Sequence, residues 1–390
     1  MSNLSPVSTP ADRRALASVA TQFFVNGAVF ASFIPRLPEI RDRLDVSIDV
    51  IGLLLTIGAA VGVAGSLVGP LLIRRLGTRL TLIVGATALI LTLPIIGFAG
   101  SVVAVAIGLM LMNAFDVIVD IAMNLQGSWL SARRHAPVMN RLHGLWSLGT
   151  VIGGIVAARV AAAGVSLETH LVAVTIVLAA ALIFVGRGLL RVDETAEDSE
   201  ADTPAPGAMR SIIVLLGLGG AFAIAVELIS SDWAAFRLRD DFDTTLGFAG
   251  LGYVAYTSGM TVGRFSGDAI LTRFGSSRMM SISVGIAAVG LTGASLFPNR
   301  WVVLASYVLA GVGNATMFPM LYDRAAQLPG ATGAGLSALT AGSRIMVLVA
   351  PIIIGSIAAT SWSVGAAIAV VTLPSIIGFA LIQSRLYRST

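Results

Sequence analysis

The chain has 390 residues, of which 56% are hydrophobic and only 12% charged, with a net charge of +4. A soluble domain is usually about a quarter charged, so this composition excludes a soluble globular protein and indicates a chain embedded in a lipid bilayer. Because the sequence holds no cysteine and no lysine, it has no disulfide, thiolate metal site, Schiff-base lysine or P-loop.

Nothing in the sequence predicts enzyme chemistry. The three histidines, His135, His143 and His170, are too few and too scattered for a metal site. No Ser-His-Asp arrangement and no glycine-rich nucleotide loop is present. We therefore expect no enzymatic activity, no cofactor, no bound metal and no nucleic-acid partner.

Apolar runs of about 20 residues, the length that crosses a bilayer, recur along the whole chain. The polar opening MSNLSPVSTPADRR leads directly into the first run, which we interpret as an uncleaved first helix rather than a signal peptide. The sequence therefore predicts an all-α membrane protein with twelve transmembrane helices. The approximate spans are 17–36, 49–72, 79–98, 102–127, 137–163, 168–189, 210–233, 246–270, 277–297, 300–323, 333–360 and 362–386.

The arginines indicate the orientation. If the N-terminus is cytoplasmic, sixteen of the 25 arginines fall on the cytoplasmic side, six on the opposite side and three within spans. Basic residues concentrate on the cytoplasmic side of membrane proteins. The sequence thus predicts a multi-pass protein of a bacterial inner membrane with both termini in the cytoplasm.

One stretch interrupts the apolar pattern after the sixth span. Residues 190–209 are acidic, contain proline and lack periodicity, as is typical of a flexible linker. We predict an N-terminal six-helix bundle at 1–189, a cytoplasmic linker at 190–209 and a C-terminal six-helix bundle at 210–390.

The two halves repeat at a constant spacing. Arg41-Asp42 recurs as Arg239-Asp240, a difference of 239 − 41 = 198. A constant spacing across three helices indicates two parallel six-helix repeats. The same spacing relates Gly65, Gly69, Arg75, Gly77 and Asp116 to Gly263, Gly267, Arg273, Gly275 and Asn314.

The loop after the second span of each half resembles a known family. GSLVGPLLIRRLGTR (65–79) and GRFSGDAILTRFGSSR (263–278) are similar to the loop Gly-x-x-x-Asp-Arg-x-Gly-Arg-Arg of the major facilitator superfamily. Both copies lack the usual Asp, although Asp268 lies nearby in the second. FIPRLPEIRDRL (33–44) and the stretch from DIAMN to HGLWSLG (120–149) resemble a bacterial subgroup related to fucose permeases.

The resemblance covers essentially the whole chain and implies the major facilitator fold, which moves a small molecule by alternating access. A fold hosts many functions, so the resemblance leaves the substrate open. It also implies a conformational gate, for which the candidates are Arg74, Arg75, Gly77, His143, Arg264, Asp268, Arg273 and Gly275.

The fourth span carries a polar stripe. Asn113, Asp116, Asp120 and Asn124 are spaced by three or four residues, so they share one helix face. Four polar groups facing lipid would be intolerable, which places this face toward the bundle interior. Asp116 or Asp120 is therefore a candidate proton carrier, and a structural network tying this helix to its neighbours is the alternative, favoured for Asp120.

Arg344 lies near the middle of the eleventh span and forms a second polar face with Ser337 and Thr340. An arginine stays charged at any working pH, so it needs an anion. That anion is a carboxylate of the substrate, or an acid such as Asp116 or Glu227.

The seventh span supplies the alternative protonation site, Glu227. It is followed by Asp232 and Trp233, where Trp233 is expected at the membrane interface. In the next span, Tyr253 and Tyr256 share a face and are candidates to contact a substrate, with helix packing as the alternative.

His143 and Trp146 share a face of the fifth span, and His143 is either a proton relay or, more simply, a gate residue. Gln22 and Asn26 are spaced to point together into a cavity, with contacts between helices as the alternative. The full set of candidate substrate-cavity residues is Gln22, Asn26, Asn113, Trp146, Tyr253, Tyr256, Asn314, Thr340 and Arg344.

The sequence leads to a secondary active transporter, proton-coupled and monomeric in the bilayer, for a small polar organic solute such as a sugar or organic acid. A multidrug-type proton antiporter is the first alternative, disfavoured because only 7% of residues are aromatic and the candidate cavity is polar. A non-transporting membrane sensor is the second alternative.

Overall fold

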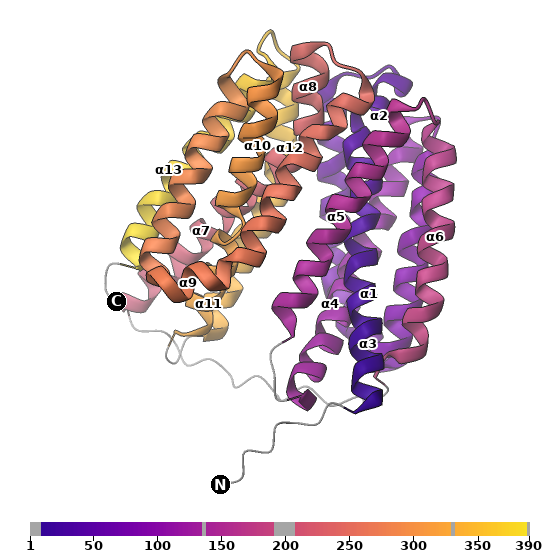
Figure 1. The fold of residues 1–390 in the computed structure, drawn as a ribbon, viewed down its shortest axis with the longest axis vertical. Helices are drawn as coiled ribbons and strands as arrows, with labels where there is room; N and C mark the ends of the chain where they lie inside the picture. Colours follow the sequence, from indigo (N-terminus) through magenta and orange to yellow (C-terminus); the bar gives the residue numbers. More distant parts are fainter. Residues whose placement is uncertain (1–8, 135–137, 191–206, 329–331, 388–390) are drawn as a thin grey trace. The chain divides into compact units, whose positions relative to one another are not determined.

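The structure, a computed structural model, describes residues 9–134, 138–190, 207–328 and 332–387, and no strand occurs within these ranges. The short 3-10 helix η1 (Ile34–Arg36) joins the first two α-helices (Figure 1). In chain order the α-helices are α1 (Pro10–Phe33), α2 (Leu37–Leu44), α3 (Ile48–Phe98), α4 (Val102–Arg134), α5 (Met139–Ala162), α6 (Leu167–Gly188), α7 (Gly207–Asp232), α8 (Ala234–Phe242), α9 (Leu246–Leu296), α10 (Arg300–Asn314), α11 (Met317–Ala326), α12 (Thr332–Ala358) and α13 (Val364–Leu386).

The helices form two compact units. The first unit comprises Met1–Ile34 and Ile57–Thr195, and the second comprises Pro35–Thr56 and Ala196–Thr390. Within the first unit α1 packs against α5, α6 and α4, and within the second α9 packs against α10 and α7 against α12. The predicted linker, 190–209, falls mostly outside the described residues.

Two helices are far longer than a membrane is thick. α3 and α9 each have 51 residues, or roughly 76 Å at 1.5 Å per residue, whereas the hydrocarbon core is about 30 Å. Each contains one glycine in a conformation closed to other residues: Gly77 at φ 76 and ψ 155, and Gly275 at φ 74 and ψ 164. Each long helix is therefore two spans that meet in a sharp bend at a glycine.

The predicted duplication is present in the backbone. The first residues of α3 and α9 are 48 and 246 and the last are 98 and 296, so both ends differ by 198. Asp45 and Asp243, which follow α2 and α8, also differ by 198 and share a left-handed conformation, with φ 51 and 48. Within the described residues one helix breaks the symmetry: α4 is continuous, but its counterpart ends at Asn314 and resumes as α11.

We expect Gly275→Ala to destabilise the protein by about 1–3 kcal/mol, because a Cβ is disfavoured at this φ and ψ. No atom lies within 4 Å of the added Cβ, so backbone strain is the only cost. Gly285→Ala is the matched control, since its Cβ also meets nothing within 4 Å but its backbone is helical. The control should leave the unfolding temperature equal or slightly higher; equal losses in both variants would contradict the strain argument.

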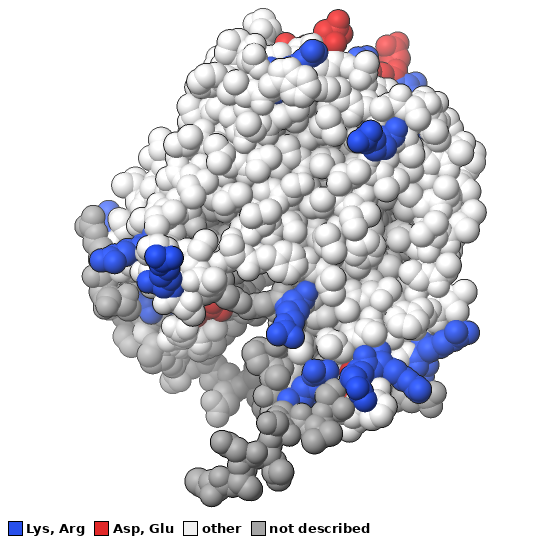
Figure 2. Space-filling view, viewed as in Figure 1, with Lys and Arg blue, Asp and Glu red and all other residues white. Residues whose placement is uncertain are grey.

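The outer surface of the helices suits lipid. Ten described helices or helix segments are long and apolar enough to cross a membrane, and one of them is the whole of α3, which bends at Gly77. Many large apolar side chains are exposed, among them Leu67, Phe98 and Val177. On the face shown in Figure 2, charged side chains gather at helix ends and leave a broad uncharged surface between them. The all-α fold with its long apolar helices is confirmed.

Small residues bring corresponding helix pairs into close contact. In the first unit, a Cβ added to Gly27 of α1 would clash with the carbonyl oxygen of Trp146 in α5. In the second unit, a Cβ added to Gly342 of α12 would clash with the carbonyl oxygen of Gly217 in α7. Backbones that approach this closely are typical of helix packing in lipid.

Candidate functional site

In the first unit, the polar residues of α1 and α4 meet. The Asn26 amide Nδ2 donates to Asp116 Oδ1 at 3.1 Å, joining two of the predicted site residues. Gln22, one turn before Asn26, is fully buried, and both polar atoms of its side chain lack a partner among the described residues. Asn26 Oδ1 is buried and unsatisfied in the same way. Buried polar groups are normally paired, so these amides have unused capacity to bind a polar molecule.

The other three polar residues on this face of α4 make two separate sets of contacts. Asn113 donates to the carbonyl oxygen of Leu109 at 2.9 Å and lies against Gly58 of α3. Asp120 is exposed, and Asn124 Nδ2 donates to its Oδ1 at 2.9 Å. Asp120 and Asn124 therefore bond to each other within α4, and both interpretations of Asp120, proton carrier and link to neighbouring helices, stay predictions.

His143 and Trp146 lie on α5 beside α1. The exposed His143 ring meets Phe23 edge to face, with 5.2 Å between ring centroids. Trp146 is half-buried, and its backbone forms the close contact with Gly27.

The second unit holds an ion pair inside the bundle. Glu227 Oε1 of α7 lies 3.6 Å from Arg264 Nη2 of α9, and the two side chains are 24% and 21% exposed. Beside them, Asn314 Nδ2 of α10 donates to the Tyr256 hydroxyl at 2.9 Å. Tyr256 and Tyr253 are buried, and both lie within electrostatic range of Glu227. The structure thus gathers five predicted residues around the first half of α9: Glu227, Tyr253, Tyr256, Asn314 and the gate candidate Arg264.

Trp233 differs from its prediction. It was expected in the interfacial belt, but its side chain is fully buried and packs against Phe236 with 5.4 Å between ring centroids. The reason is that the chain turns directly into α8 after Asp232, which folds Trp233 inward as the first residue before that helix. The belt assignment is therefore wrong.

Most gate candidates lie near the glycine bends, whereas His143 lies on α5 and Arg264 pairs with Glu227. Gly77 and Gly275 form the bends themselves, and Arg74, Arg75 and Arg273 are exposed next to them. Arg273 lies over the ring of Phe274, 5.4 Å from its centroid. The side chain of Asp268 lies outside the described part of the chain.

Arg344 lies on α12, half-buried, with Thr340 exposed one turn earlier. Across the described residues no hydrogen bond or ion pair reaches its guanidinium group. No group of three or more potential metal ligands occurs in the described ranges.

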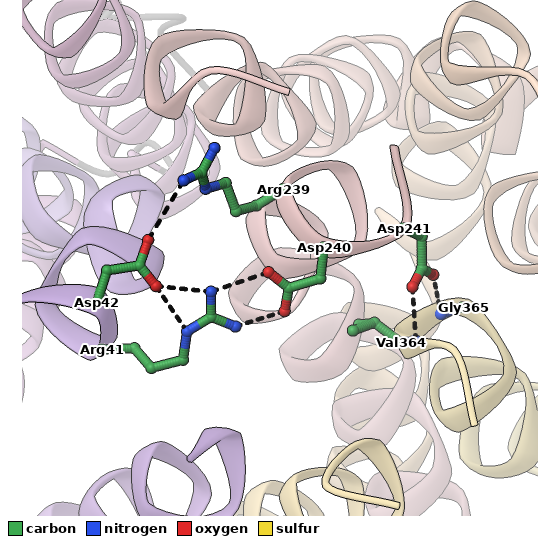
Figure 3. Close-up of polar contacts among 7 residues, drawn as sticks. All are labelled: Arg41, Asp42, Arg239, Asp240, Asp241, Val364 and Gly365. Atoms are coloured by element: carbon green, nitrogen blue, oxygen red, sulfur yellow. Dashed lines mark hydrogen bonds and ion pairs between the residues drawn. The ribbon is translucent and has the colours of Figure 1, made fainter. Parts of the chain in front are cut away.

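The sequence repeat also marked a site that the prediction did not assign. Arg41 of α2 donates to both carboxylate oxygens of Asp240 on α8, with the Nη2–Oδ1 distance at 2.9 Å (Figure 3). Arg41 also donates to Asp42 at 2.7 Å, and Asp42 lies 3.6 Å from Arg239. The duplicated Arg-Asp dipeptide thus pairs with its own copy. We refer to Arg41, Asp42, Arg239 and Asp240 as the ionic clasp.

A second acid anchors the α8 side of the clasp. Asp241 accepts hydrogen bonds from the backbone N–H groups of Val364 and Gly365 at 3.0 and 2.8 Å, at the start of α13 (Figure 3). Arg237 pairs with the same carboxylate and also donates to the carbonyl oxygen of Phe297 at 2.9 Å. These bonds fix α8 to α9 and α13, so the clasp residues of α8 project from a rigid base.

Comparison with known proteins agrees with this architecture. Residues 19–235 match the family described as the Major Facilitator Superfamily. The chain is 27% identical over 351 residues to the membrane protein MosC of Rhizobium meliloti, covering 90% of this chain and 85% of that protein. It is 25% identical over 348 residues to an uncharacterised MFS-type transporter of Yersinia pestis, covering 88% and 89%.

Two solved transporters share the fold. The nucleoside transporter NupG matches with a TM-score of 0.71 at 11% identity, covering 97% of this chain and 99% of that one. A bacterial homologue of the human lysosomal transporter Spinster matches with a TM-score of 0.63 at 15% identity, covering 98% and 96%. The narrower resemblance to the fucose-permease subgroup stays a prediction. The chain therefore belongs to the Major Facilitator Superfamily and is a multi-pass bacterial membrane transporter, a carrier rather than an enzyme.

Proposed function

We propose that the protein is a proton-coupled secondary transporter that carries a small polar organic solute by alternating access. The observation that carries the proposal is the contact between Asn26 and Asp116, 3.1 Å long and set inside the first unit beside the buried, unsatisfied Gln22. An ionisable group within a transmembrane bundle is costly and is retained where it has a function. A carboxylate next to uncommitted amides provides both a proton acceptor and groups that bind a polar solute.

Among the three candidate acids, Asp116, Asp120 and Glu227, the hydrogen-bond partner of Asp116 favours it as the proton carrier. A carboxamide donates through its NH₂ group and accepts through its oxygen. Asn26 therefore pairs with ionised Asp116 as a donor and, after its amide turns over, with protonated Asp116 as an acceptor. Glu227 lies 3.6 Å from the permanent cation Arg264, and protonating Glu227 would remove the attraction within that ion pair. The contact of Asp116 with a neutral amide therefore accommodates a proton more readily than the ion pair of Glu227 does.

The buried, unsatisfied amide atoms also favour a polar solute. Leaving a buried donor or acceptor unsatisfied costs about 1–3 kcal/mol. Gln22 and Asn26 in the first unit carry such atoms, and so do Asn314 and Ser230 in the second. Within the first unit, a solute with several hydroxyl or carbonyl groups would satisfy the amides of Gln22 and Asn26, whereas an amphipathic drug with few such groups would not.

The test of function is uptake into proteoliposomes. Purified protein is reconstituted, an inward proton gradient is imposed, and accumulation of radiolabelled sugars and organic acids is measured. Accumulation that a protonophore abolishes supports the proposal. Movement of solute down its gradient with no response to pH would overturn the proton coupling, and the absence of flux for every polar solute would overturn the transport assignment.

We further propose that both termini are cytoplasmic, and the cysteine-free sequence makes this directly testable. Ser277, just after the α9 bend, and Ser361, between α12 and α13, are both exposed. The proposed topology places Ser277 in the cytoplasm and Ser361 outside. In intact cells an impermeant maleimide should label Ser361→Cys and spare Ser277→Cys, and inside-out vesicles should reverse the result. The opposite pattern would invert the topology.

A further inference from the structure

Arg344 occupies a costly position. It lies eleven residues after Gly333 and fourteen before Ala358, the two ends of its apolar segment, which is roughly 16 and 21 Å along the helix. An arginine at such a depth does not face lipid, because its charge would be unsolvated there. Its guanidinium group needs water, an acid or a bound anion.

The packing of α12 shows which way Arg344 points within the second unit. Ala338, Leu339 and Gly342 form the face against α7, where they contact Gly217 and Gly220. At about 100° per residue, Arg344 lies on the opposite side of the helix from this face. Arg344 therefore points away from α7, the helix that carries Glu227.

The side of α12 that bears Arg344 is covered at one end only. Toward the C-terminus, the Thr56 hydroxyl donates to the carbonyl oxygen of Leu348 at 3.1 Å, and Gly52 lies against Pro351. Toward the N-terminus the same side presents Ser337 and Thr340, and both are exposed within the structure. Arg344 thus stands at the border between a packed turn and an open polar one.

The two acids of α7 in the second unit have partners other than Arg344. Glu227 pairs with Arg264 at 3.6 Å, and Asp232 accepts a hydrogen bond from the Ser231 hydroxyl at 2.8 Å. In the part of the second unit that the structure describes, no carboxylate pairs with Arg344. Of the counter-charges that the sequence offers, an anion of the solute, Asp116 or Glu227, the arrangement of the second unit removes Glu227.

We propose that Arg344 is an anion-binding residue and that the transported solute carries a carboxylate or phosphate group. The planar guanidinium fork binds either group through two parallel hydrogen bonds. The Thr340 hydroxyl, one turn away on the same side, is a further donor to the anion. This inference rests on the proposed transport function and narrows its substrate class to organic anions.

The test compares neutral sugars with related solutes that carry a carboxylate or phosphate group. Thermal unfolding of the purified full chain is measured with galactose and galacturonate, glucose and gluconate, and glucose 6-phosphate. A ligand that binds the folded state raises its unfolding temperature. We expect stabilisation by an anionic member and not by its neutral partner. Comparing gluconate with glucose 6-phosphate distinguishes a carboxylate ligand from a phosphate ligand.

Variants assign the effect to Arg344. In Arg344→Gln the affinity for the stabilising anion should fall more than tenfold, and Arg344→Lys should keep part of it because the charge remains but the fork is lost. Arg278→Gln, at an exposed position after the α9 bend, is the control for a general loss of positive charge and should match the wild type. Equal binding of the anion by Arg344→Gln and the wild type would overturn the inference.

Two other outcomes also count against it. One is stabilisation by neutral sugars alone, and the other is no stabilisation by any carboxylate or phosphate in the panel. Proton-driven uptake of a neutral solute that survives Arg344→Gln would overturn this inference and leave the proposed transport function standing. Absence of all flux would instead remove the proposed function.

Discussion

Replacing Asp116 by Asn should abolish proton-driven accumulation of solute while leaving exchange of solute across the membrane intact. Asn is nearly the same size and keeps a hydrogen bond to Asn26, but it does not take up or release a proton. A gradient of one pH unit is worth about 1.4 kcal/mol per proton, so one-proton symport concentrates solute about tenfold. The accumulation ratio in the variant should fall to about one.

Two matched variants make the result specific. Asp120→Asn removes the exposed carboxylate one turn along the same helix, and accumulation should persist. Glu227→Gln removes the partner of Arg264, which should lower the stability of the protein more than its coupling. If accumulation survives in Asp116→Asn and is lost in Glu227→Gln, the proton-carrying residue would be Glu227 of the second unit.

Reversing one charge of the ionic clasp should be the most disruptive change on the surface of the second unit. Asp240→Arg sets an arginine beside Arg41 and Arg239, replacing two charge-assisted hydrogen bonds with repulsion. The side chains are partly exposed, Arg41 at 16% and Asp240 at 26%, so solvent weakens the effect. We expect a loss of about 1–3 kcal/mol in stability, measured as a lower unfolding temperature and a lower transport rate.

The duplicated dipeptide supplies the control. In the double variant Arg41→Asp with Asp240→Arg, the clasp has acids at its two α2 positions and arginines at its two α8 positions, which restores two opposite-charge pairs. Its unfolding temperature should recover most of the loss, as a double-mutant cycle for a direct interaction requires. Additive losses in the double variant would show that the two residues do not interact.

The sequence alone determined the features that depend on local spacing and composition. Apolar runs of membrane length predicted the all-α fold, since only helices satisfy their own backbone in lipid. The constant difference of 198 predicted that the two halves correspond, as the matching bounds of α3 and α9 show. It also related Gly77 to Gly275, the two glycines with positive φ angles inside these helices. The spacing of three and four residues likewise predicted that Asp116 shares one face of α4 with Asn113, Asp120 and Asn124.

Tertiary structure decided which polar groups meet. The sequence offered Asp116, Glu227 or a substrate as the counter-charge of Arg344, and a helix's spacing does not show its rotation against its neighbours. Within the second unit the packed helices pair Glu227 with Arg264, and within the first unit they pair Asp116 with Asn26. The same limit hid the burial of Trp233 and the contact of Arg41 with Asp240, residues 199 positions apart in the chain. Periodicity defines the faces of a helix, but only packing assigns each face its partner.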